Sequence, residues 1–246
     1  MPYPSYLNID EYSAIRQNGC IPLAWLAALR DAQPVDTEAG GFWGWESTPW
    51  ETTDSIDRAI NVLQRDEYLW AYFNILSLLL EEIQQVPTEE PISFDVSEFA
   101  AVDPAREQAA RGASDNFRAM LRMLHRGERD AALAALRQLS ADLNLDAGLP
   151  FTGDLDADIA AMGGSENALQ ELTWSIMGEI YEGPAERAEW YTPEHYRINF
   201  WHWLAAPGPA PAPKGAPKEA PPADGTTGNG SVIAGVVNHN GSAPEL

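Results

Sequence analysis

Apolar residues recur at helical spacing along most of the chain, and the clearest case follows Thr48. Thr48 can cap a helix, Pro49 suits its first position, and Glu51 completes a Thr-x-x-Glu capping box. The apolar side chains that follow recur at i, i+3, i+4 and i+7: Ile56, Ala59, Ile60 and Leu63. The pattern therefore predicts a helix that begins at Pro49 and includes Leu63, before the polar stretch from Gln64 to Glu67.

Further helices are predicted on both sides of this one. The segment 1–32 is expected to hold one or two short helices, and the segment 33–41 a loop. Residues 66–85 are predicted to form one buried helix. Residues 114–126 and 128–143 predict an αα-hairpin around Gly127. Shorter patterns predict helices at 154–162, at 165–182 and from residue 192 onward.

Residues 92–96 alternate apolar and polar side chains, with Ile92, Phe94 and Val96 on one side. One short strand cannot form a sheet by itself, so this segment is interpreted as an extended connector. The predicted fold class is all-α, or mainly α. It is an irregular multi-helix bundle with αα-hairpins and at most one short strand pair.

The composition changes abruptly at residue 205. Eight of the 19 prolines lie between positions 205 and 246, among alanine, glycine and lysine, which predicts a disordered, extended tail. A short apolar patch at 231–237 is a candidate docking element, with Val232, Ile233, Val236 and Val237. The chain is thus divided into an acidic helical domain, 1–204, with a sub-boundary near 87–112, and a tail, 205–246.

The charge balance limits the classes of partner. The chain has 37 acidic and 15 basic residues and a formal net charge of −22. A field of this sign repels nucleic acid and anionic membranes, and it favours a basic protein partner or serves solubility alone. The longest apolar stretch, from Tyr68 to Leu80, is too short to span a bilayer. A single cysteine, Cys20, and no recognisable signal peptide indicate a cytoplasmic protein.

Common catalytic and cofactor-binding motifs are absent from the sequence. There is no P-loop, dinucleotide-binding glycine motif, nucleophile elbow, zinc-protease motif or Cys-x-x-Cys pair. Asp154, Asp156 and Asp158 have the spacing of a calcium loop, but Ile159 and Ser165 replace its required glycine and glutamate. These aspartates are interpreted as helix N-terminal acids. No metal, cofactor or catalytic residue is assigned.

Seven of the 15 basic residues fall between Arg106 and Arg137. Within this group, Arg118, Arg122 and Arg126 follow i, i+4 and i+8, which places them on one helix face. They are candidate contacts for an anion or phosphate. The alternative is that they pair with nearby carboxylates or face water.

Nine tryptophans are a large number for this length. Aromatic residues at this density either fill a core or line a groove for a sugar, base or peptide. The candidates for an aromatic groove are Trp43, Trp45, Trp50, Trp201 and Trp203.

Three functions remain open on the sequence. The first and favoured one is a non-catalytic acidic interaction protein, such as an inhibitor, an immunity-type protein or an adaptor, that binds a basic protein. The second is an assembly chaperone or scaffold that docks through its tail. The third is a carboxylate-based hydrolase with a tryptophan-lined groove, for which the candidate acids are Glu46, Glu51, Glu179 and Glu182.

Overall fold

The structure, a computed structural model, describes residues 3–10, 13–87, 89–145, 148–178 and 180–182. Its strands are β1 (Pro4–Asp10), β2 (Ser13–Asn18), β3 (Gln33–Asp36), β4 (Phe42–Ser47), β5 (Ile92–Asp95) and β6 (Ile180–Glu182). Its helices are α1 (Leu23–Leu26), α2 (Pro49–Leu63), α3 (Glu67–Phe73), α4 (Leu76–Ile83), α5 (Ser97–Ala100), α6 (Pro104–His125), α7 (Arg129–Leu143), α8 (Leu155–Ala161) and α9 (Ser165–Leu172), followed by a π-helical segment at Thr173–Met177. The fold is mixed α and β, so the all-α prediction is wrong.

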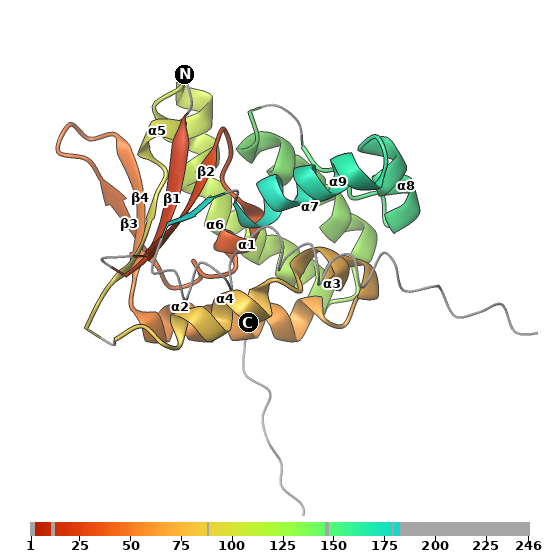
Figure 1. Ribbon diagram of the computed structural model, residues 1–246, viewed down its shortest axis with the longest axis horizontal. Helices are drawn as coiled ribbons and strands as arrows, with labels where there is room; N and C mark the ends of the chain where they lie inside the picture. Colours follow the sequence, from red (N-terminus) through yellow and green to blue (C-terminus); the bar gives the residue numbers. More distant parts are fainter. Residues whose placement is uncertain (1–2, 11–12, 88, 146–147, 179, 183–246) are drawn as a thin grey trace, which may run out of the picture. The chain divides into compact units, whose positions relative to one another are not determined.

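The strands form one antiparallel sheet in the order β3-β4-β5-β1-β2-β6 (Figure 1). β1 and β2 make one hairpin, and β3 and β4 make another. β5 lies between the two hairpins, where Phe94 is opposite Leu7 of β1 and Trp45 of β4. Residues 92–96, interpreted from the sequence as a connector, therefore contain the strand that joins the sheet.

The N-terminal hairpin replaces the one or two helices predicted for the segment 1–32, of which only α1 is present. Leu7, Ile9 and Ile15 are buried on the core side of the hairpin. Ser5 and Gln17, which lie opposite each other, are also fully buried. Two polar residues at core positions interrupt the alternation that would have indicated strands.

Helices cover one side of the sheet and supply most of the core. α5 contacts β1 and β4, and α6 contacts β4, α1, α2 and α7. α2 and α4 lie side by side (Figure 1). The largest fully buried side chains come from helices, strands and one loop: Trp25, Tyr72, Phe73, Phe94, Phe99, Phe117 and Phe151.

Several predicted helices are confirmed. The capping box of Thr48 and Glu51 is present at the start of α2. α6 and α7 form the predicted hairpin, although α6 begins earlier, at Pro104 after the cap residue Asp103. The predicted helix at 66–85 is instead two helices, α3 and α4. The side chain of Asn74 at the break donates to the carbonyl of Ala71 (3.3 Å), and such local bonds compete with helix continuation.

Some sequence-based expectations lie outside the described residues: the helix from residue 192, the tail at 205–246 and its apolar patch. Residues 87–112, where a sub-boundary was placed, contain β5, α5 and the first turns of α6. No helix in the described part of the chain is both long enough and apolar enough to cross a bilayer.

The second hairpin depends on a bulge in β4. Gly44 is opposite Val35 while Phe42 is opposite Asp36, so Trp43 is an extra residue on β4. The shift lets Phe42 and Trp45 both reach the core, where their rings meet edge to face at 4.9 Å. Gly44 has a φ of 155°, and a Cβ there would lie 1.8 Å from the carbonyl oxygen of Phe94. Only glycine fits this position.

Replacing Gly44 by alanine should therefore destabilise the protein by about 3 kcal/mol or more, because β4 and β5 would have to separate. The matched control is Gly40→Ala. Gly40 also has a positive φ, of 84°, but a Cβ there would meet nothing within 4 Å, so its cost should be about 1 kcal/mol. Urea unfolding of both variants measures the difference, and equal losses would contradict the close approach.

Candidate functional site

A pocket of about 290 Å³ opens between the β3–β4 turn, α5 and the start of α6. Most of its wall is apolar. Two glutamates, Glu98 and Glu107, are part of the lining. The complete lining is Thr37, Gly41, Phe42, Ser97, Glu98, Ala100, Ala101 and Glu107.

The first wall is the β3–β4 turn and the start of β4. Thr37 closes the turn: its N–H donates to the carbonyl of Gly41 (2.7 Å), and its hydroxyl accepts from the N–H of Gly41 (3.0 Å). Phe42 follows directly and is buried against Trp45. The turn thus places an aromatic ring in the pocket wall.

The second wall is α5, which begins where β5 ends. The carboxylate of Asp95 accepts from the N–H (2.9 Å) and the hydroxyl (2.7 Å) of Ser97. This local bonding turns the chain out of the sheet and into the helix. Phe99 and Ala100 are then buried, while Glu98 is exposed. A carboxylate is thereby held at the pocket rim beside an apolar wall.

The third wall is the first turn of α6. Asp103 caps this helix by accepting from the N–H groups of Ala105 (2.8 Å) and Arg106 (2.9 Å), and Pro104 takes the first helical position. Glu107 lies in the first turn, where the helix dipole favours a negative charge.

Arg111, one turn beyond Glu107, joins the walls at one side of the pocket. Its guanidinium pairs with Glu107 (2.8 Å) and with Asp36 of β3 (2.8 Å). The guanidinium carbon also lies 4.7 Å from the centre of the Phe42 ring. Hydrogen bonding to Glu107 raises the pKa of Arg111; burial opposes this rise, and hydrogen bonding to Asp36 adds to it.

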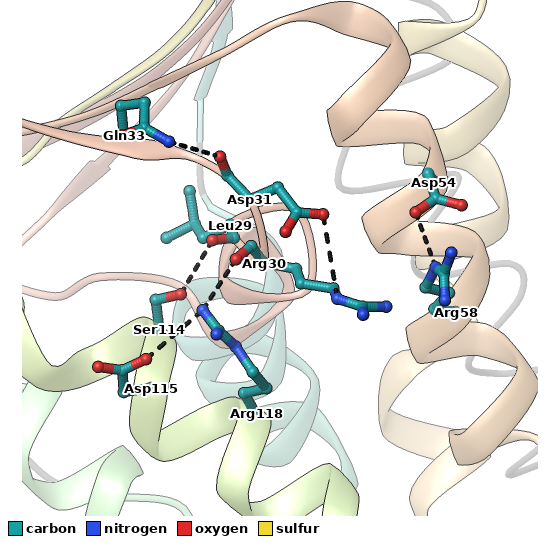
Figure 2. A network of polar contacts seen from close by, with 9 residues as sticks. All are labelled: Leu29, Arg30, Asp31, Gln33, Asp54, Arg58, Ser114, Asp115 and Arg118. Carbon is teal, nitrogen blue, oxygen red and sulfur yellow. Dashed lines mark hydrogen bonds and ion pairs between the residues drawn. The ribbon is translucent and has the colours of Figure 1, made fainter. Parts of the chain in front are cut away.

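A polar network fixes the chain that leads from α1 into β3. Figure 2 shows Ser114 and Arg118 of α6 beneath this segment: the Ser114 hydroxyl donates to the carbonyl of Leu29 (3.0 Å), and Arg118 donates to the carbonyl of Arg30 (2.8 Å). Gln33 donates to the carbonyl of Asp31 (3.3 Å). Since β3 leads into the turn that lines the pocket, this network holds that turn over α6.

The predicted arginine stripe is divided among different contacts. Arg118 binds the carbonyl of Arg30 and pairs with Asp115 (3.4 Å). Arg126, at the end of α6, pairs with Glu128 (2.8 Å). Arg122 is exposed, and its side chain has no ion pair among the described residues. The stripe remains a hypothesis as an anion contact, but two of its three members bind the protein itself.

The predicted aromatic groove is not gathered at one place by the described tryptophans. Trp45 is buried in the core, Trp43 is half-buried beside the bulge, and Trp50 on α2 is 72% exposed. Trp201 and Trp203 lie outside the described residues, as do the tail candidates Val232, Ile233, Val236 and Val237.

The proposed hydrolase carboxylates are likewise not gathered in the described part of the chain. The Glu51 carboxylate accepts from the backbone N–H (3.1 Å) and hydroxyl (2.9 Å) of Thr48, and these bonds lower its pKa. Glu46 is exposed on β4. Glu179, and the side chain of Glu182, are outside the described residues. No described cluster of histidine, cysteine and acidic residues could hold a metal ion.

A buried polar cluster was missed by sequence analysis. Asp158 of α8 is fully buried, and its carboxylate accepts hydrogen bonds from the hydroxyls of Tyr68 and Tyr72. The hydroxyl (2.6 Å) and N–H (2.9 Å) of Thr152 also donate to it. Next to Thr152, Phe151 has a φ of 38°, a strained value for a side chain of this size. Asp158 thus ties a strained loop to α3. It also lies in the first turn of α8 with Asp156, and Asp154 caps this helix, as expected for helix N-terminal acids.

Only weak signals for the pocket are present in the sequence. Phe42 directly precedes Trp43, one of the candidate groove tryptophans, and the Asp103-Pro104 pair is a recognisable helix start. Nothing in the sequence brings Glu98 and Glu107 to Phe42, because that requires the pairing of β4 with β5. In comparisons with known proteins, no family model, curated sequence or solved structure gave a significant match to this chain.

Replacing Asp158 by alanine should destabilise the protein by about 3 kcal/mol or more, because two tyrosine hydroxyls and Thr152 would lose a charged acceptor in the interior. Asp156→Ala, an exposed aspartate on the same helix, is the control and should cost less than about 1 kcal/mol. Urea unfolding measures both. Similar losses in the free energy of unfolding for the two variants would show that the Asp158 cluster contributes little to stability.

The same cluster predicts a loss of stability in alkali. Burial, and then the hydrogen bond to Asp158, raise the pKa values of Tyr68 and Tyr72. The folded protein therefore keeps protons that the unfolded chain releases, so this contribution is full below about pH 10 and decreases above it. Tyr72→Phe should make the free energy of unfolding less dependent on pH between about pH 9 and pH 11. An unchanged dependence would contradict this.

Proposed function

We propose that this protein is a non-catalytic acidic binding protein whose Phe42 pocket receives a basic side chain of a protein partner. The observation that carries the proposal is the combination of an apolar wall with two rim glutamates, Glu98 and Glu107. Lysine and arginine have an apolar stem and a charged end, so they match such a pocket in both parts.

The use of the protein's own arginines supports this proposal. Arg106 donates to the carbonyl of Asp142 (2.6 Å), and Arg137 to that of Phe151 (3.1 Å). Guanidinium groups held at main-chain carbonyls are not paired through these contacts with surface carboxylates. In a chain of net charge −22, the excess of acids is left to attract a basic partner.

A cytoplasmic location is part of this proposal and rests on the single cysteine, Cys20, which is buried. The two alternatives remain predictions. Docking through the tail concerns residues outside the described part of the chain. The hydrolase would use glutamates that the described residues do not bring together.

The test is a binding measurement with a short arginine-rich peptide, by isothermal titration calorimetry at low and high salt. We expect binding that weakens as salt is added, because exposed charges are screened. The double substitution Glu98→Gln and Glu107→Gln should weaken binding about tenfold or more, since it removes two partners of a bound cation.

The control is the double substitution Glu67→Gln and Glu81→Gln, which removes the same charge from exposed positions on α3 and α4. It should change the affinity by less than about threefold, through the long-range field alone. If both double variants lose affinity equally, the attraction is a general effect of net charge and the pocket is not the site. An affinity that does not change with salt concentration would exclude the proposal altogether.

A further inference from the structure

The structure places one of the protein's own cations at the rim of the pocket. Arg111 does not line the cavity, but it contacts two residues that do, Phe42 and Glu107. It also pairs with Asp36 at the end of β3. An arginine of the same chain thus makes contacts with an aromatic ring and carboxylates like those that the proposed function assigns to the partner's side chain.

The geometry of these contacts suits arginine better than lysine. A guanidinium is planar, so it can lie over the face of the Phe42 ring while its edge donates to carboxylates. Here a single Nη atom lies 2.8 Å from both Asp36 and Glu107. An ammonium is a compact point charge and cannot stack in this way. The surroundings of Arg111 therefore indicate the chemistry of the preferred ligand.

The contacts of Arg111 are also easily broken. Its side chain is 38% exposed, and its two carboxylate partners, Asp36 and Glu107, are 56% and 35% exposed. Exposed ion pairs contribute little to stability, and a contact with the face of an aromatic ring adds a similarly small amount. The side chain of Arg111 can rotate into solvent while the buried residues of α6, such as Ala110 and Ser114, stay in place.

We infer that Arg111 is an internal competitor for the pocket, and that the partner's side chain is an arginine that displaces it from Phe42 and Glu107. The inference rests on the proposed function and specifies its ligand and its regulation. Displacement releases two carboxylates, Glu107 and Asp36, which then join Glu98 around the incoming guanidinium. Binding in the wild-type protein is weakened by the need to remove Arg111 first.

The experiment compares wild-type protein with Arg111→Gln and Arg126→Gln, using the arginine-rich peptide and a lysine-rich peptide of equal charge. Both variants lose one positive charge; Arg111→Gln frees Asp36 and Glu107, and Arg126→Gln frees Glu128. Arg126 is the C-cap of the helix that carries Arg111, about 22 Å away along its axis. Circular dichroism and thermal unfolding confirm that each variant is folded.

Arg111→Gln should bind the arginine-rich peptide about fivefold to thirtyfold more tightly than wild type, because the competing contacts are gone. The affinity of Arg126→Gln for the arginine-rich peptide should lie within about twofold of the wild-type affinity, because the variant changes only the long-range field by one charge. The lysine-rich peptide should gain less than the arginine-rich peptide from Arg111→Gln.

Other outcomes separate this inference from the proposed function. If wild type and Arg111→Gln bind equally, or the variant binds more weakly, Arg111 is not a competitor, although the pocket can still be the site. Equal gains in both variants would assign the effect to net charge, which also overturns the inference. If no form of the protein binds either peptide, the proposed function and the inference both fail. Binding by Arg111→Gln alone would support the inference and show that Arg111 blocks the pocket in the wild-type protein.

Discussion

The pairing of β5 with strands on both sides is the interaction on which the rest of this structure depends. β5 is very short, yet it connects a hairpin at the N-terminus to a hairpin around residue 40. Leu7, Phe94 and Trp45 lie side by side across three strands on the core face. On the opposite face, Asn8 donates to the Ser93 hydroxyl (3.0 Å). Without β5, the sheet would divide into the β3–β4 hairpin and a piece made of β1, β2 and β6, and an isolated hairpin is marginally stable in water.

The pocket follows from this pairing. Asp95 ends β5 and begins α5, so the position of Glu98 is set by the strand that precedes it. Gly44 allows β4 to approach the carbonyl of Phe94 closely, and the bulge next to it turns Phe42 toward α5 and α6. Two stretches that are distant in the sequence, residues 37–42 and residues 97–107, therefore supply one small cavity, and the pairing of β4 with β5 holds them together.

The local features of the helical part of this fold could be predicted from the sequence, whereas contacts between distant segments could not. The capping box at Thr48 and the hairpin of α6 and α7 were found because their signals lie within a few residues. The sheet was missed because Ile92 and Phe94 were recognised as a strand without partners. Their partners lie far earlier in the chain, in β1 and β4. Propensity cannot indicate such pairing, and the buried Ser5 and Gln17 concealed the pattern of β1 and β2.

The contacts of charged side chains could not be predicted from the sequence either, because they too depend on distant segments. Asp158 has the spacing of a calcium ligand and the place of a helix N-terminal acid, yet the structure buries it against Tyr68 and Tyr72. The arginines of α6 form a positive stripe in the sequence, but Arg118 binds the carbonyl of Arg30 and Asp115 of the same helix, and Arg126 pairs with Glu128. Periodicity along a helix shows which side chains share a face. The segments that cover that face are determined by the rest of the chain. The pattern of charges along the sequence therefore predicted the contacts of the arginines less well than the capping residues predicted the helix ends.

The arrangement around Arg111 connects folding to the proposed binding. Asp36, Glu107 and Glu98 lie on three different elements near one apolar wall, and carboxylates gathered in this way repel one another. A cation at this place relieves the repulsion while the pocket is empty. A partner's arginine can take over that role only by supplying equivalent contacts. The repulsion between these carboxylates thus makes the site selective for cationic ligands. A neutral ligand that displaced Arg111 would leave the three carboxylates without a positive charge beside them.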